Sequence, residues 1–243
     1  MPHTIPQIHE RLAGQGFVVS KVFHLTDCSP TLDSLAMLMG FQHRVFEPLL
    51  RHMRGNIREH PGFYVELGGM SRNDVAAVKS LCHLLRANGL LEDWSVQRGE
   101  SRIGGRVADS PAAFDFLTGG WLEHCCRIFI QQFLNLDTEI IEIGQNVQVT
   151  RPDGRTFEMD ILLWIAGDLH WWEAKAGRHE QEQLARYRAV REELGLDATH
   201  CTLVLPQAGP MGRLDHFGLQ TGFTVITPDR IGERVEEIEE RYR

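Results

Sequence analysis

Residues 157–177, FEMDILLWIAGDLHWWEAKAG, combine a strongly apolar run with charges that do not belong in an ordinary protein core. Asp160, Glu173 and Lys175 lie within the run, and Glu158 lies close by. Burying an unpaired charge costs several kcal/mol, so a chain that keeps such residues must compensate them. What compensates them is the main question raised by this sequence.

The same stretch predicts a β-hairpin. Two apolar runs of strand length, Met159–Ile165 and Leu169–Ala174, flank Ala166-Gly167-Asp168, which is a tight-turn signal. Side chains alternate between the two faces of a strand, the two charged residues of each strand are two positions apart, and the two strands are paired across the turn. They are therefore expected to project from one face of the hairpin. The opposite face is expected to carry an apolar layer: Met159, Ile161, Leu163, Ile165, Trp172 and Ala174.

Two registers of this hairpin are open, and they place different partners opposite Asp160. With Ala166 and Gly167 as the loop, Asp160 faces Glu173; with Gly167 and Asp168 as the loop, it faces Lys175. Two carboxylates across a strand pair repel each other unless positive charge lies between them. A divalent cation such as Mg²⁺ is one candidate, because hard cations bind carboxylate and carbonyl oxygens. The alternative is a buried salt-bridge cluster, in which Lys175 pairs with Glu158 and Asp160.

Composition bounds the class of protein. The chain has 243 residues, 42% of them hydrophobic and 24% charged, which is ordinary for one large globular domain or two small ones. Its five cysteines show no CxxC spacing, so reduced thiols are expected. No stretch has the apolar length of a membrane span and the N-terminus does not read as a signal peptide, so a cytoplasmic location and no membrane partner are expected. The net charge of −8 argues against a general binder of polyanions.

Residues 110–243 read as alternating helices and strands. The expected order is a helix over 111–133, a strand over 139–150, the charged hairpin, a helix over 179–194, a strand over 200–205, a Gly/Pro-rich link, a short strand over 223–226 and a terminal helix. This order predicts an α/β sandwich with a mixed sheet.

Residues 1–109 predict a different, mainly α-helical module. Ser71 is a capping candidate for a helix that ends at Ala87, and strands over 90–97 and 106–108 flank a basic, glycine-rich tip at Arg98–Gly105. Helix, strand, flexible tip and strand form the back half of a winged helix, a module that binds DNA or mediates protein contacts. Upstream, Pro48 and Gly55 are expected to break a helix that carries several arginines.

Asp160 followed by Glu173-Ala174-Lys175 at the end of the next strand resembles the D…ExK motif of the PD-(D/E)XK nuclease superfamily, whose core has the same element order. Two further segments strengthen the resemblance: GGWLE at 119–123, and the Gln183-Leu184-x-x-Tyr187 pattern of RecB-like members. The combination most closely resembles the nuclease domain of CRISPR ancillary nucleases that carry a cyclic-oligoadenylate sensor (CARF) domain. The resemblance covers about residues 110–205, or begins at residue 71 if the winged helix is included. Residues 1–70 show no βαβ pattern of such a sensor.

The resemblance implies roles for single residues. Asp160, Glu173 and the backbone carbonyl of Ala174 would bind Mg²⁺ or Mn²⁺, and Glu123 would complete the metal site directly or through water. Lys175 would hold the attacking water and offset charge in the transition state. Gln183 would orient the scissile phosphate or the lysine. The alternatives for Glu123 and Gln183 are a helix-surface acid and a solvated side chain.

The expected function is therefore a metal-dependent endonuclease that hydrolyses phosphodiester bonds, in defence, restriction or repair. DNA is favoured as the substrate, RNA is an alternative, and a homo-oligomer is a further expectation. The competing function is a catalytically silent nuclease-fold protein that binds nucleic acid or serves as an adaptor.

Overall fold

The computed structural model describes residues 5–23, 30–55, 57, 61–97, 102–134, 141–176, 181–206 and 212–243. The chain divides into two compact units. The sheet unit comprises Met1–Cys28 and Cys126–Arg243, and the N-terminal unit comprises Ser29–Cys125. The division falls inside helix α6 (Trp121–Phe133), which therefore contributes to both.

The sheet unit is built on a six-stranded mixed sheet with the order β1-β5-β6-β7-β8-β9. The first four strands in this order pair antiparallel, whereas β7, β8 and β9 pair parallel. Together with the helices on its faces, this sheet confirms the predicted α/β sandwich. The strands are β1 (Val18–Phe23), β5 (Ile141–Thr150), β6 (Thr156–Ile165), β7 (Asp168–Ala174), β8 (Cys201–Val204) and β9 (Thr224–Ile226).

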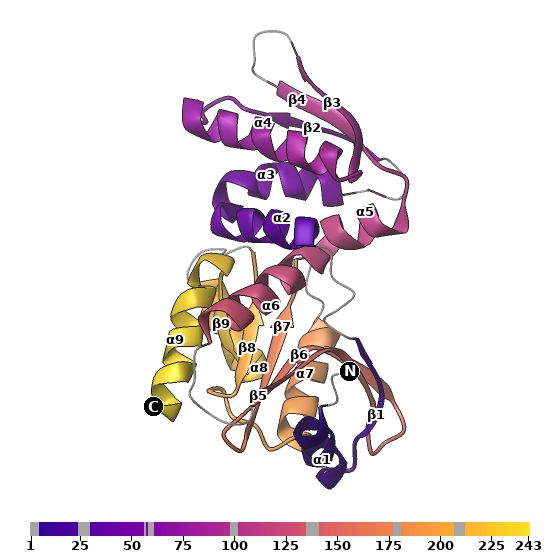
Figure 1. Cartoon of the computed structure of the whole chain (residues 1–243), viewed down its shortest axis with the longest axis vertical. Helices are drawn as coiled ribbons and strands as arrows, with labels where there is room; N and C mark the ends of the chain where they lie inside the picture. Colours follow the sequence, from indigo (N-terminus) through magenta and orange to yellow (C-terminus); the bar gives the residue numbers. More distant parts are fainter. Residues whose placement is uncertain are drawn as a thin grey trace. The chain divides into compact units, whose positions relative to one another are not determined.

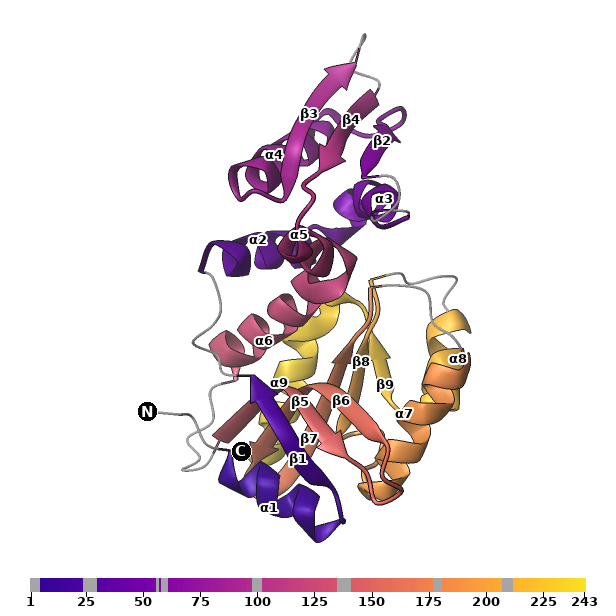
Figure 2. The ribbon, with the colours of Figure 1, turned by 90° about the vertical axis from the view of Figure 1, so that its right-hand side faces the viewer.

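Helices cover both faces of this sheet (Figure 2). On one face, α7 and α8 pack against Trp171 and its neighbours in a cluster that includes Tyr187 and Phe217. On the other face lies α9, whose Tyr242 hydroxyl is 2.8 Å from Nε2 of His170 on β7. The helices of this unit outside α6 are α1 (Pro6–Gly14), α7 (Gln181–Glu193), α8 (Gly212–Thr221) and α9 (Ile231–Tyr242).

Residues 5–23 belong to the sheet unit, which differs from the predicted division at residues 109 and 110. The apolar side chains Ile5, Ile8, Leu12 and Phe17 join the buried cluster of the sheet. The carboxylate of Glu142 on β5 accepts hydrogen bonds from the backbone N–H groups at the start of α1, at 3.0 Å. Helix α1 is thus capped by a residue more than 130 positions away along the chain, and β1 pairs with the distant strand β5.

In its described residues, the N-terminal unit contains the helices α2 to α5, a π-helix, η3 (Phe116–Gly120), the start of α6 and a three-stranded antiparallel sheet (Figure 1). Its strands follow the order β2-β4-β3. The predicted helix and the two strands of the winged-helix pattern are present as α4, β3 and β4, but β4 begins at Arg102, inside the segment 98–105 that was expected to be the tip. The elements are α2 (Pro30–Phe41), α3 (His43–Arg54), β2 (Gly62–Glu66), α4 (Arg72–Ala87), β3 (Leu91–Gln97), β4 (Arg102–Val107) and α5 (Pro111–Asp115).

Two predictions from local sequence can be compared with this unit: the cap of α4 is confirmed, and the break in α3 is wrong. Ser71 caps α4 as expected, because its side-chain oxygen accepts a hydrogen bond from the Asp74 N–H at 3.1 Å. The expected break at Pro48 is wrong, since α3 continues through this proline. Its buried stripe of Phe46, Leu49, Leu50 and Met53 offsets the missing backbone hydrogen bond. The tip residues 98–101, including Arg98, lie outside the described residues.

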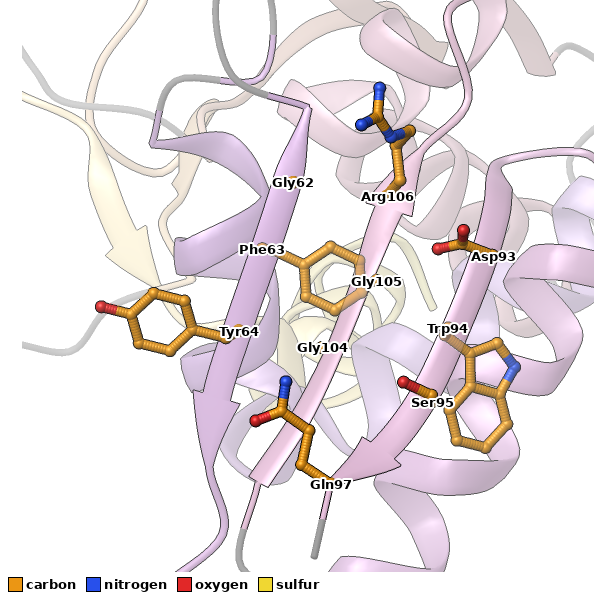
Figure 3. Close-up of a pocket in the computed structure, with 10 residues that line it drawn as sticks. All are labelled: Gly62, Phe63, Tyr64, Asp93, Trp94, Ser95, Gln97, Gly104, Gly105 and Arg106. Atoms are coloured by element: carbon orange, nitrogen blue, oxygen red, sulfur yellow. The ribbon is translucent and has the colours of Figure 1, made fainter.

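A shallow groove of about 620 Å³ lies on the three-stranded sheet (Figure 3). Its floor is the middle strand, where Gly104 pairs with Tyr64 on one side and Ser95 on the other. At the next position a Cβ atom on Gly105 would lie 2.5 Å from the Asp93 carbonyl oxygen, so only glycine fits there. Gly104 and Gly105 line the groove on this strand, and neither places a side chain in it.

In the C-terminal part, the expected order of elements is confirmed apart from one added helix and a break in the first one. The single helix expected over 111–133 is divided into α5, the π-helix η3 with a kink at Gly119, and α6. Helix α8 lies where a Gly/Pro-rich link was expected. Its N-terminal neighbours 207–211 lie outside the described residues. Within α8, Phe217 packs into the cluster of the sheet, and the hydroxyl of Thr221 donates to the Phe217 carbonyl at 2.8 Å. Tertiary burial overrides the glycines at positions 212 and 218.

Candidate active site

The turn between β6 and β7 selects one of the two predicted registers. Ala166 and Gly167 form the loop, with φ values of 49° and 103°, and Ile165 pairs with Asp168. Positive φ at both loop residues is the signature of the hairpin turn whose twist matches that of the strands. The paired register runs back to Ile161 opposite Trp172, so the next position places Asp160 opposite Glu173.

Asp160, Glu173 and Lys175 form one group of charged side chains at the end of this hairpin. The Lys175 Nζ donates to both carboxylate oxygens of Asp160, at 3.1 and 2.8 Å, and lies 3.1 Å from Oε2 of Glu173. The backbone N–H of Ala174 donates to Oδ2 of Asp160 at 2.8 Å. The two carboxylates therefore lie on the same face of the sheet, as predicted, and share a single ammonium group.

The group is buried, and burial is the largest single influence on the pKa values of Glu173 and Lys175. The side chains of Asp160 and Glu173 are 5% and 1% exposed, whereas that of Lys175 is 25% exposed. Burial, with the nearby charge of Asp160, raises the pKa of Glu173 to about 8. Burial alone would lower the pKa of Lys175, but the charges of Glu173 and Asp160 outweigh it and raise that pKa. Two carboxylates and one ammonium leave an excess of negative charge whenever both acids are ionised.

The strand alternation changes phase beside Asp160, which corrects two details of the predicted face. Glu158 is exposed and accepts a hydrogen bond from Gln148 at 2.8 Å, so it does not pair with Lys175. Met159 belongs to the same buried cluster as Trp171, whose indole contacts Glu173, and so it does not lie in a separate layer opposite the site.

Strand β5 has an irregular residue opposite this phase change. Gln145 pairs with Ile161 and Val147 with Met159, and between them Asn146 has a φ of 47°. A left-handed residue within a strand interrupts the regular pleat and re-aims the side chains around it. By register, Asn146 lies opposite Asp160, so the irregularity falls directly beside the candidate site.

Gln183 does not contact the acids directly; it reaches them through Tyr187. Its amide Nε2 donates to the Tyr187 hydroxyl at 2.8 Å, one helical turn away on α7. Burial, and then the negative charge of Glu173, raise the pKa of Tyr187. Gln183 and Tyr187 thus lie on the side of α7 that faces the hairpin. Both residues belong to the QxxxY pattern, although the resemblance in sequence assigned a role to Gln183 alone.

Trp171 contacts the site, and the sequence reasoning missed it. Its indole Nε1–H donates to Oε1 of Glu173 at 3.0 Å, and both side chains are buried. Trp171 lies two positions before Glu173 on one strand, so alternation already placed the two on one face. That signal was present in the sequence, but a buried tryptophan is ordinarily attributed to the core.

Glu123 was predicted to complete a metal site with Asp160 and Glu173. Glu123 lies in the first turn of α6, in the residues of the N-terminal unit, and its role as a metal ligand stays a prediction. Among the described residues, no three side chains of His, Cys, Asp or Glu form a group that could hold a metal ion. A cation bound by Asp160 and Glu173 would therefore need further oxygens, such as the predicted carbonyl of Ala174.

The acid pair nevertheless fits a divalent cation. Within the described part of the chain, the buried Oε2 of Glu173 makes no hydrogen bond, although Lys175 lies 3.1 Å away as an ion-pair partner. A buried carboxylate oxygen without a hydrogen bond is costly, and a metal ion would satisfy it. Carboxylate oxygens are also the ligands that Mg²⁺ and Mn²⁺ prefer.

Two solved structures share this fold at low sequence identity. Protein VC1899 from Vibrio cholerae matches with a TM-score of 0.62 and 19% identity, over 97% of this chain and 61% of that chain. Can2 from Sulfobacillus thermosulfidooxidans, in complex with cyclic tetra-adenylate (cA4), matches with a TM-score of 0.63 and 16% identity, over 95% of this chain and 59% of that chain. The chain thus spans about three-fifths of the length of these proteins. The likeness includes both units, whereas the resemblance seen in sequence was limited to residues 71–205 at most.

No protein-family model matches the chain, and no curated protein matches it. The helices within the described residues include none with the length and apolar character needed to span a membrane. The described cysteines, Cys82, Cys125, Cys126 and Cys201, are free thiols, in agreement with the expectation from their spacing.

Proposed function

We propose that the sheet unit is a metal-dependent nuclease that hydrolyses phosphodiester bonds. The observation that carries this proposal is the buried group of Asp160, Glu173 and Lys175, in which two acids share one lysine. A salt-bridge cluster with no other task gains little from a second acid, because each buried charge adds a desolvation cost. The likeness in fold to Can2, a protein whose structure contains cA4, adds support for a CRISPR-associated role in defence.

The two acids and the lysine would have different roles in the reaction. Asp160 and Glu173 would hold Mg²⁺ or Mn²⁺, with the Ala174 carbonyl and Glu123 as further candidates. The bound ion would make water nucleophilic and stabilise charge on the leaving oxygen. Lys175, a quarter exposed and on a flexible stem, would hold the attacking water or a phosphate oxygen. Its ammonium lies 2.8 Å from Oδ2 of Asp160, beside the oxygens that would bind the ion.

Gln183 and Tyr187 would orient the acid group without binding the metal ion. The hydrogen bond between them fixes the Tyr187 hydroxyl beside the acid group, where it limits the orientations open to Glu173 and Lys175. Gln183, half-buried at the start of α7, is in addition the candidate to orient the scissile phosphate. DNA is the favoured substrate, with RNA as the alternative.

The test is cleavage of plasmid DNA, single-stranded DNA and RNA in Mg²⁺, Mn²⁺ or EDTA. Each reaction is run with and without cA4, the ligand of the Can2 structure. We expect cleavage in either metal, none in EDTA, and none by Lys175→Ala or Asp160→Ala. Lys21→Ala is the matched control, because Lys21 is an exposed lysine on β1 of the same sheet. Equal cleavage in EDTA, or full activity of Lys175→Ala, would contradict the proposal.

A further inference from the structure

The carboxylate of Glu173 is held from within the core by a tryptophan. The Nε1–H of Trp171 donates to Oε1 of Glu173 at 3.0 Å. Another donor to the same oxygen is the backbone N–H of Asp160, at the longer distance of 3.4 Å. The indole is therefore the closer of the two donors. It approaches Oε1, and Oε2 receives no hydrogen bond from the residues that the structure describes.

We propose that Trp171 is a positioning residue of the candidate active site, whose indole N–H orients the Glu173 carboxylate so that Oε2 is presented to a divalent cation. This inference rests on the proposed function, because it assigns a task to Trp171 within the same site. It does not make Trp171 a catalytic residue, since the indole touches Glu173 and neither the substrate nor the metal.

The packing around Trp171 suits that task. The side chain is fully buried, and its ring meets three other aromatic rings edge-on. The ring centroids of Phe157, Tyr187 and Phe223 lie 5.6, 6.0 and 4.9 Å from that of Trp171. Such contacts fix the indole in one rotamer, so its N–H is directed at Glu173 before any ligand arrives. A donor held in this way orients a ligand residue without losing conformational entropy.

The neighbouring residue supplies a matched comparison. Trp172 is also buried, at 1% exposure, but its Nε1 has no hydrogen-bond partner among the described residues. Replacing either tryptophan by phenylalanine removes the same atoms from an equally buried position of one strand. The two variants therefore lose similar packing, and they differ in the hydrogen bond to Glu173.

The experiment compares Trp171→Phe and Trp172→Phe by calorimetric titration with Mn²⁺ and by cleavage kinetics. Partners of metal ligands typically change metal affinity or activity about 10- to 100-fold. We expect such a loss of Mn²⁺ affinity in Trp171→Phe, a lower kcat that excess Mn²⁺ partly restores, and an unchanged KM for nucleic acid. Trp172→Phe is expected to keep the Mn²⁺ affinity of the wild type.

Equal Mn²⁺ affinities in the two variants would overturn the inference. If Trp171→Phe does not fold, 3-benzothienylalanine at position 171 keeps the bicyclic shape of tryptophan and has a sulfur atom in place of the donor N–H. The same loss is expected, and wild-type affinity would overturn the inference. The proposed function fails in a different way, with no Mn²⁺ binding and no cleavage by the wild type itself. The two failures are thus distinguishable.

Discussion

Two antiparallel hairpins of this protein carry charged residues, and they use them differently. In the β3–β4 hairpin and its neighbour β2, Arg102 pairs with Glu66 and Arg106 lies 3.6 Å from Glu92, all with exposed side chains. In the β6–β7 hairpin, one lysine serves two buried carboxylates. The exposed pairs are balanced one to one and are solvated. The buried group holds two acids for one lysine, so it carries excess negative charge when both acids are ionised, and this marks it as a candidate site.

The largest expected difference between the hairpins is in the effect of removing the cation. Lys175→Ala is expected to reduce cleavage by at least about 100-fold, because it removes a charge directed at the reacting phosphate. In EDTA it is also expected to lower the free energy of unfolding by about 3 kcal/mol, since it leaves buried acids unpaired. Arg106→Ala is expected to change the free energy of unfolding by less than about 1 kcal/mol. Urea denaturation and a cleavage gel measure both quantities.

Similar losses of unfolding free energy in Lys175→Ala and Arg106→Ala would contradict the expected difference between the buried and the exposed hairpin. That outcome would mean that the acid group is hydrated or protonated enough to need no partner. A stable Lys175→Ala protein that has lost only cleavage would still support the nuclease proposal, but not the strong electrostatic coupling.

The second effect is a dependence of stability on pH. The folded protein raises the pKa of Glu173 from its usual 4.5 to about 8, so between these values the folded state holds a proton that the unfolded chain has lost. The free energy of unfolding of the metal-free protein should therefore fall as pH rises through this window, by up to about 1.4 kcal/mol per pH unit. Denaturation at several pH values, with Glu173→Gln as the reference, measures this slope.

In Glu173→Gln this slope should be absent, because glutamine does not titrate. Glu158→Gln is the matched control, since Glu158 is an exposed acid on the neighbouring strand and should leave the slope intact. A wild-type protein whose stability rises through this window would show that Glu173 is ionised in the folded state.

A smaller effect is expected for the exposed hairpin, and it concerns nucleic acid. Replacing Arg98, Arg102 and Arg106 together by alanine is expected to weaken nucleic-acid affinity. The slope of log affinity against log salt should flatten by about 0.9 for each phosphate that the variant no longer neutralises. Arg230→Ala with Arg243→Ala is the control, because these exposed arginines also pair with glutamates, in the sheet unit. Unchanged binding across a salt series would assign the N-terminal unit to protein contacts.

The smallest effect is expected at the turn that sets the register of the buried group. Ala166 has a φ of 49°, a region that costs an L-residue with an ordinary side chain about 1 kcal/mol and that asparagine tolerates better. Ala166→Asn should therefore raise the free energy of unfolding by about 0.5–1 kcal/mol without changing metal binding. Thermal denaturation measures the shift, and a destabilised variant would argue against the strain at Ala166.

Some features of the β6–β7 hairpin could be predicted from the sequence, and others could not. The D…ExK spacing, the hairpin and its two possible registers followed from local periodicity and from one turn signal. The choice between the registers did not, since Ala166-Gly167 and Gly167-Asp168 are both plausible loops. The phase change beside Asp160 coincides with the left-handed Asn146 on another strand, and no pattern within the hairpin could reveal it.

By itself, the sequence determined the elements that depend on neighbours along the chain: the helix capped by Ser71, the alternating strands, and the placing of Asp160, Glu173 and Lys175 on two adjacent strands. The tertiary structure decided which distant segments complete the site. In the folded protein, β1 pairs with the sheet and α1 packs on it, Lys175 forms ion pairs with both acids, and the Trp171 indole donates a hydrogen bond to Glu173. The physical reason is that helix and strand periodicity is written into consecutive residues, whereas the partner of a buried polar group depends on which apolar faces pack together around it.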